Sequence, residues 1–368
     1  MIRLRSRLCL ALLLLAASTA CRSNSDFFEP RNQSSQSRRL RLESIDEDLD
    51  RAEWDLNEGK NVKALDRLED VRKLEGLDAE ARNRAELLME RGSVQRLNEL
   101  IQLNAPADDF EDLFDAEVPK RVRVTAGVMA ARRRLEDNEP LEAYSTIRKV
   151  DLEFTSHHER AAAGGVIAEA GFALAESTER HLLFFSYKAR APEVLEYLVL
   201  NYPSNRHGEQ AYLLLSELYE EDNELELALE RYEDLLLYYR DSLYLAYAEA
   251  RIPELRLRLI VGPEYDRAQI ERAHLELVNW LTRHPDHELN SFVLDALAEC
   301  QRLEIDSDLS IASFYRRVDK TFGARLHASR ALELAIQVGD QERIRRANEI
   351  LDDVLPRQDG VNAGEDNS

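Results

Sequence analysis

Apolar residues recur at helical spacing along most of the chain, and no segment shows the sustained apolar–polar alternation of a half-buried strand. In residues 195–203, for example, apolar positions three and four apart run up to the sequence Tyr202-Pro203. The composition agrees, since 44% of residues are hydrophobic, 33% are charged, and only 13 are Gly and 10 are Pro. Together the pattern and the composition predict an all-α protein.

Several predicted helices share one internal spacing. An alanine is followed by apolar residues four and seven positions later, and in residues 191–203 and 273–285 a proline then closes the helix. Proline ends a helix because it lacks an N–H and disfavours the α conformation in the residue before it. The same spacing, without the proline, recurs at Ala64, Ala143, Ala228 and Ala324.

The segment before Ala228 predicts a partner helix. Residues 212–219 read YLLLSELY, and a polar turn at 221–223 follows. This pattern resembles the tetratricopeptide repeat (TPR), a helix–turn–helix unit of about 34 residues. Small residues such as Ser216 and Ala228 allow two helices to cross closely. The resemblance implies a TPR-like α-solenoid of stacked antiparallel helix pairs.

Residues 1–20 read as a secretory signal, with three early arginines and a short apolar run at 8–17. The run is too short to span a bilayer, which takes roughly 20 apolar residues. Because Cys21 directly follows Ala20, the segment resembles a bacterial lipobox, although Ser18 stands where Leu is usual. The resemblance implies that Cys21 is lipidated and anchors the protein to a membrane. An ordinary secretory signal with an incidental cysteine is the alternative.

The rest of the chain divides by composition and pattern. We expect a disordered tether at 21–40, N-terminal helical repeats at 41–177, a TPR domain at 178–355, and a disordered tail at 356–368. The first expected helix carries apolar residues at alternating spacings of three and four, namely Leu42, Ile45, Leu49, Ala52 and Leu56.

Residues 178–355 resemble the BamD family, lipoproteins of the outer-membrane β-barrel assembly machine. The likeness is carried by five segments: 202–204, 211–228, 266–285, 311–315 and 322–325. In the family, an aspartate like Asp266 opens the third of these segments, and an Ala-x-Phe-Tyr run like 312–315 begins a long helix.

The resemblance implies a location on the periplasmic face of the outer membrane, with the barrel-assembly subunit and unfolded outer-membrane proteins as partners. This chain departs from the family at Arg240, which replaces a proline, and at Val338-Gly339-Asp340, where Tyr-Pro-Asp is usual. It also carries the additional helices at 41–175. These extra helices favour an alternative, a generic envelope TPR adaptor for cell-wall or division complexes.

Two sets of residues are candidates for partner binding. By TPR geometry the groove positions of the clearest repeat are Leu213, Glu217 and Glu220, although an acidic solvated helix face is the simpler interpretation. The second set is basic on a chain whose net charge is −22, and could steer an acidic partner. It consists of Arg316, Arg317, Lys320 and Arg325. The simpler interpretation of the second set is pairing with Glu304, Asp306 and Asp308.

The sequence gives no sign of catalysis. It has no phosphate-binding glycine loop and no assignable catalytic arrangement, so we expect no enzyme, no cofactor and no small-molecule substrate. The adjacent residues His157-His158 would point apart on a helix and could not chelate a metal together. We expect Cys300 to be buried and inert, and the glycines at 164, 165 and 171 to allow close helix packing. The strong acidity argues against nucleic acid as a partner.

We predict that the Cys21→Ala substitution releases the protein from membranes into the soluble envelope fraction, because one covalent lipid would be its only anchor. Fractionation of cells that express each form measures this. Intact mass spectrometry of the mature wild-type chain provides the check, and an unmodified Cys21 thiol there would contradict the prediction.

Overall fold

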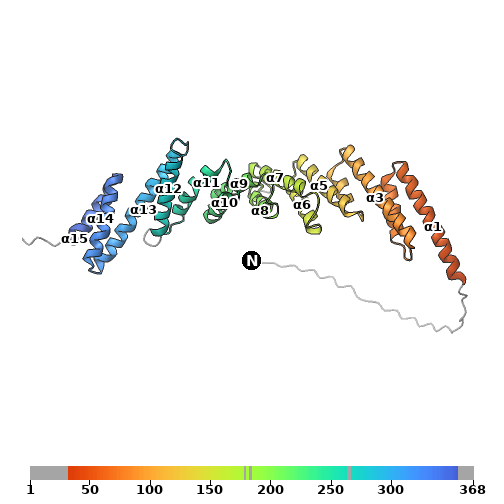
Figure 1. The fold of residues 1–368 in the computed structure, drawn as a ribbon, viewed down its shortest axis with the longest axis horizontal. Helices are drawn as coiled ribbons and strands as arrows, with labels where there is room; N and C mark the ends of the chain where they lie inside the picture. Colours follow the sequence, from red (N-terminus) through yellow and green to blue (C-terminus); the bar gives the residue numbers. More distant parts are fainter. Residues whose placement is uncertain (1–31, 178–179, 182–184, 263–266, 355–368) are drawn as a thin grey trace, which may run out of the picture. The chain divides into compact units, whose positions relative to one another are not determined.

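The computed structural model describes residues 32–177, 180–181, 185–262 and 267–354 (Figure 1). These residues form fifteen α-helices, one short 3₁₀ helix and one antiparallel ladder of two residues per strand. The α-helices pack in consecutive pairs, which confirms the predicted all-α solenoid. In this part of the chain no helix is both long enough and apolar enough to cross a membrane.

By its contacts the chain forms two compact units, Met1–Gly92 and Ser93–Ser368, and the boundary between them falls within α3. The first unit holds α1 (Asn32–Asn57), α2 (Asn61–Arg72) and the first part of α3 (Ala79–Gln102). Helix α1 begins inside the predicted tether, so 32–40 are helical, and 21–31 lie outside the described residues. The predicted apolar stripe of α1 is buried at Ile45, Leu49, Ala52 and Leu56, and the side chain of Leu42, its first member, lies outside what the structure describes.

The second unit contains the remaining elements. In chain order these are α4 (Ala107–Asp115), α5 (Lys120–Glu136), α6 (Pro140–Glu153), α7 (Arg160–Glu176), β1 (Arg180–His181), β2 (Phe185–Ser186), η1 (Lys188–Arg190), α8 (Ala191–Asn201), α9 (Gly208–Glu221), α10 (Leu225–Tyr238), α11 (Leu245–Arg258), α12 (Arg267–Arg283), α13 (Asn290–Arg317), α14 (Thr321–Val338) and α15 (Gln341–Val354). One hydrophobic core runs from Val128 to Leu255, so it continues across the predicted domain boundary at 177/178.

The two helices of a pair are joined by a repeated turn. One residue of the turn has a positive φ, which Asn and Asp tolerate better than other side chains and Gly tolerates best. The next residue donates its N–H to the carbonyl five positions back, as Glu224 does to Tyr219 at 2.8 Å. Six turns of the described residues have this form, with the positive φ at Gly59, Asn104, Asn138, Asn223, Asp319 and Gly339.

In four of these turns, those at Gly59, Asn138, Asn223 and Asp319, an alanine lies five residues after the turn residue, one turn into the second helix. These four alanines are fully buried, as the predicted close contacts require, and so are Ala191 and Ala273, which open the same apolar spacing in α8 and α12. We call them the anchor alanines; they are Ala64, Ala143, Ala191, Ala228, Ala273 and Ala324.

The Tyr202-Pro203 sequence ties the end of one helix pair to the pair before it. The Tyr202 N–H donates to the Leu198 carbonyl at 2.8 Å and ends α8. Its hydroxyl donates to buried Asp151 at 2.6 Å, and Asp151 also accepts from Tyr197 at 2.8 Å. The equivalent residue of the next pair is Tyr239, which packs against Gly208, the first residue of α9. The Tyr239 hydroxyl lies where a Cβ on Gly208 would be.

Pro253 lies buried inside α11, which continues past it to Arg258. Two local predictions were wrong. The run at 312–315 lies near the end of α13 instead of beginning a long helix. His157 is in the turn between α6 and α7, not on a helix, and its ring bonds to Asp151 at 3.0 Å.

Two of the three glycines of α7 mark close helix contacts, as predicted. A Cβ on Gly171 would lie 2.5 and 2.9 Å from side-chain atoms of Leu195 in α8. A Cβ on Gly164 would lie 2.6 Å from the Asn205 side chain. The third, Gly165, has no atom within 4 Å of that position, so its lack of a side chain serves no packing purpose.

We predict opposite effects on stability when each of two glycines of α7, only six positions apart, is replaced by alanine. Gly165→Ala should stabilise the protein by up to about 1 kcal/mol, because alanine is the better helix former. Gly171→Ala should destabilise it by about 1–3 kcal/mol, because fully buried Leu195 has no free space to move into. Chemical denaturation of both variants measures the difference. Equal stability of the two variants would show that α7 and α8 do not pack this closely.

Candidate partner-binding surfaces

The predicted groove positions all lie on α9, but Glu220 has partners inside the protein. Its carboxylate pairs with Arg251 of α11 and accepts the Tyr232 hydroxyl of α10 at 2.9 Å. Only 12% of the Glu220 side chain is exposed. Glu220 therefore joins three helices and is not part of an acidic solvated helix face, the simpler interpretation of these positions. Leu213 and Glu217 are half-buried.

The Glu220–Arg251 pair belongs to a larger network. Arg251 also pairs with Glu254 at 3.5 Å and lies over the ring of Phe292, which is on α13, at 4.9 Å. Arg258 approaches Glu220 at 3.6 Å. Removing one member of such a shielded pair leaves a charge without a partner, which is strongly destabilising. The network fixes the relative placement of α9, α10, α11 and α13.

Glu217 is the unusual acid of this face. Burial raises its pKa, and the negative charges of Glu220 and Glu221 raise it further. Burial likewise raises the pKa of Glu254. This face therefore carries two carboxyl groups that hold a proton at a higher pH than ordinary glutamates do.

A second surface lies where α13 meets α14. We call it the α13–α14 corner. It combines exposed apolar side chains with the predicted basic residues, and its members are Phe314, Val318, Phe322, Leu326, Arg316, Arg317, Lys320 and Arg325. The Phe322 side chain is 71% exposed and Phe314 is 52% exposed. Exposed phenylalanines beside arginines are the residue types that protein interfaces favour.

The basic residues of the corner do not pair with the acids we expected. Arg316 pairs with Asp353 at 2.8 Å. Arg317, Lys320 and Arg325 are exposed and form no ion pair with any residue in the described ranges.

The three expected acids have other partners. Asp306 pairs with Arg343 at 2.6 Å and with Arg346 at 3.3 Å. Asp308 pairs with Arg267 at 2.7 Å, also accepting from His327, and Glu304 pairs with His274. The simpler interpretation of the basic residues was therefore wrong, and three positive charges of the corner stay open to solvent.

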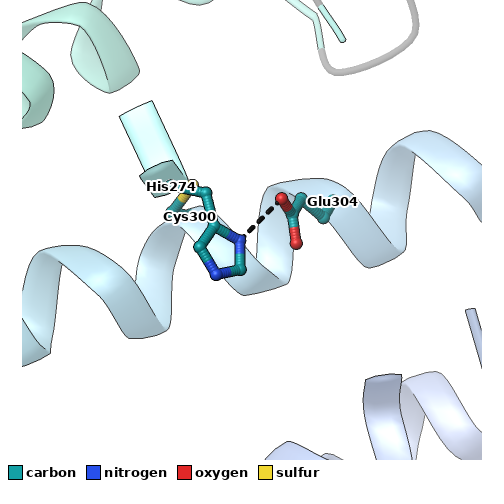
Figure 2. A group of neighbouring side chains, drawn as sticks. All are labelled: His274, Cys300 and Glu304. Carbon is teal, nitrogen blue, oxygen red and sulfur yellow. Dashed lines mark hydrogen bonds and ion pairs between the residues drawn. The ribbon is translucent and has the colours of Figure 1, made fainter. Parts of the chain in front are cut away.

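The sequence analysis missed a third group of side chains, His274, Cys300 and Glu304 (Figure 2). His274 Nδ1 lies 2.8 Å from a Glu304 oxygen. Cys300 is fully buried as predicted, and its thiol donates to the Ile270 carbonyl at 3.3 Å. Burial raises the pKa of this thiol to about 12, and the nearby carboxylates of Glu304 and Glu299 add to the effect. In the sequence, the signal for this group was the spacing of four residues between Cys300 and Glu304, which is about one helical turn.

Cys21, the signal at 1–20 and the tail at 356–368 lie outside the described residues. No family model and no curated protein matches the chain. Among solved structures, a match is a "circular tandem repeat protein with novel repeat topology and enhanced subunit contact surfaces". It is 16% identical, with 88% of this chain and 91% of that chain covered at a TM-score of 0.22. The assignment to a helical-repeat fold rests on the helix pairs described above.

We predict that Glu217→Gln raises the melting temperature at neutral pH. A carboxyl group whose pKa is raised by folding binds its proton more tightly in the folded state. It therefore costs stability once pH rises through that raised value. Glutamine removes this cost, so the gain should shrink as pH falls towards 4.5, the ordinary value for glutamate.

Thermal unfolding at neutral and acidic pH measures the effect, with Glu333→Gln as the control. Glu333 is exposed in the middle of α14 and forms no ion pair among the described residues, so its substitution should change little. A gain for Glu217→Gln that persists unchanged at acidic pH would contradict the prediction.

Proposed function

We propose that this protein is a lipid-anchored scaffold on the periplasmic face of the outer membrane that works by binding proteins and not by catalysis. As the BamD resemblance implies, it would take part in the assembly of outer-membrane β-barrel proteins. Its partners would be the barrel-assembly subunit and unfolded outer-membrane proteins. The observation that carries the proposal is the α13–α14 corner, which lies in the part of the chain that resembles BamD.

The corner has the chemistry of a binding surface for an acidic partner. The chain contains 71 acidic residues and 49 Lys or Arg residues, so acidic side chains outnumber the basic ones that could pair with them. Arg317, Lys320 and Arg325 nevertheless remain without one among the described residues. Charges of this kind speed the encounter with a partner of opposite sign. The neighbouring Phe314 and Phe322 supply apolar area that a partner can bury.

The first helices of the chain support the alternative. Helices α1 and α2 and the first part of α3 form a unit with its own buried core, and α4–α7 add further helices before the region that resembles BamD. A general envelope adaptor for cell-wall or division complexes would use such helices for additional partners. The two functions differ in the partner that the corner binds.

We predict that reversing the three unpaired charges slows association with the periplasmic domains of the barrel-assembly subunit. The variant is Arg317→Glu, Lys320→Glu and Arg325→Glu combined. We expect association to slow by about tenfold or more, since steering charges change association rates by 10–10³. Wild-type association should also weaken at high salt, which screens exposed charges. Surface plasmon resonance at two salt concentrations measures both effects.

The matched control reverses three exposed arginines elsewhere, Arg82, Arg121 and Arg132, and makes the same change in net charge. It should associate at close to the wild-type rate. If both variants slow equally, net charge and not the corner is responsible. If the wild-type protein co-purifies with no barrel-assembly component, the envelope adaptor becomes the better function.

A further inference from the structure

His274, Cys300 and Glu304 lie together at the contact between α12 and α13 (Figure 2). Cys300 and Glu304 are one turn apart on α13 and so share one face of that helix. His274 reaches them from α12. One nitrogen, one sulfur and one carboxylate oxygen all lie within 4.8 Å of one another. We propose that these three side chains bind a zinc ion and leave a fourth position for water.

The distances suit zinc after a small adjustment. With bonds of about 2.0–2.3 Å in a tetrahedral arrangement, the ligand atoms around zinc lie roughly 3.3–3.7 Å apart. The His274–Glu304 contact of 2.8 Å would open slightly, and the longest separation of at most 4.8 Å would close. Rotation of side chains can supply shifts of this size, so the two helices need not move apart.

The donor types favour zinc over the hard cations. Thiolate and imidazole are ligands of zinc and other borderline or soft metals, whereas magnesium and calcium select oxygen ligands. Glu304 and Glu299 place negative charge near the Cys300 thiol, which favours a divalent cation at this point. Without an ion, His274 and Glu304 satisfy each other and the thiol bonds to Ile270, so the site is stable when empty.

Binding can be written with its protons balanced. Cys300 binds as a thiolate and its proton leaves to solvent. In the empty site His274 Nδ1 carries the hydrogen that Glu304 accepts, and on binding this proton leaves to solvent. His274 then binds through Nδ1 and takes up or keeps one proton on Nε2, the ring nitrogen on the far side from Glu304 in Figure 2. Glu304 binds as a carboxylate. His274 is 29% exposed and Glu304 is 16% exposed, so an ion can enter and a water can complete the coordination.

Cobalt(II) is the probe for the site, because tetrahedral cobalt bound to a thiolate gives a sulfur-to-metal charge-transfer band. The experiment uses the full chain with Cys9→Ser and Cys21→Ser, so that Cys300 is its only thiol. We expect one cobalt per chain, displacement of cobalt by zinc, and a higher melting temperature with zinc, since an ion that binds the folded state stabilises it.

Cys300→Ser should abolish the charge-transfer band. His274→Gln should lower zinc affinity by more than the roughly 10–100-fold that the loss of an outer-shell partner costs. His284→Gln is the matched control, because His284 is also half-buried on the α12 side of the protein and lies near Glu249. It should bind zinc as the parent chain does.

Two results would overturn the proposal: no charge-transfer band in the parent chain, or unchanged zinc affinity in Cys300→Ser. Circular dichroism establishes that each variant is folded. If His274→Gln or Cys300→Ser unfolds, Glu304→Gln replaces it, because this substitution keeps the shape of the side chain and removes its charge. Zinc affinity in folded Glu304→Gln equal to that of the parent would then count against the site.

Discussion

The close crossing of two helices at a buried alanine is the constraint on which the rest of the structure depends. At Ala228 the turn residue Asn223 sets the start of the second helix, and the alanine sets how near the two helices approach. Tyr239, at the end of the same helix, packs against the first residue of α9. Turn, crossing and helix end are thus fixed by contacts within about one repeat, so each pair forms without reference to distant parts of the chain.

Because these contacts are local, one helix of a pair can be longer than its neighbours, and two of the three candidate sites, the α13–α14 corner and the group of His274, Cys300 and Glu304, lie on such a helix. Helix α13 has 28 residues, whereas α9 and α10 have 14 each. Its middle supplies Cys300 and Glu304 to the contact with α12, and its last turns carry Phe314 and Arg317 beyond the buried stripe. At these two sites the extra length of α13 supplies the candidate residues.

The sequence was sufficient for features that depend on spacing within one helix pair. The anchor alanines, the buried stripe of α1 and the burial of Cys300 were all predicted, because periodic apolar positions report which face is inside. The sequence did not predict which charged side chains pair with each other. Glu220 binds Arg251, which is 31 positions away on another pair, and only the packing of the pairs brings them together. Periodicity also places large apolar residues inside, so it could not show that Phe322 is exposed while small Ala324 and Ala328 fill the contact.

The distribution of ion pairs connects stability with binding. An acidic excess gives most arginines an internal partner, and the partially shielded pairs, such as Arg251 with Glu220, hold neighbouring helices in one arrangement. Arg343, which pairs with both Asp306 and Asp340, does the same between α13 and α15. A basic side chain without an internal partner therefore marks a surface where an external partner can bind. Asp306 and Asp308, the acids expected to pair with the basic residues of the α13–α14 corner, are instead engaged by arginines that join neighbouring helices. Arg317 and Lys320 thus have no ion-pair partner among the described residues, so the charge of that surface is left for an external partner.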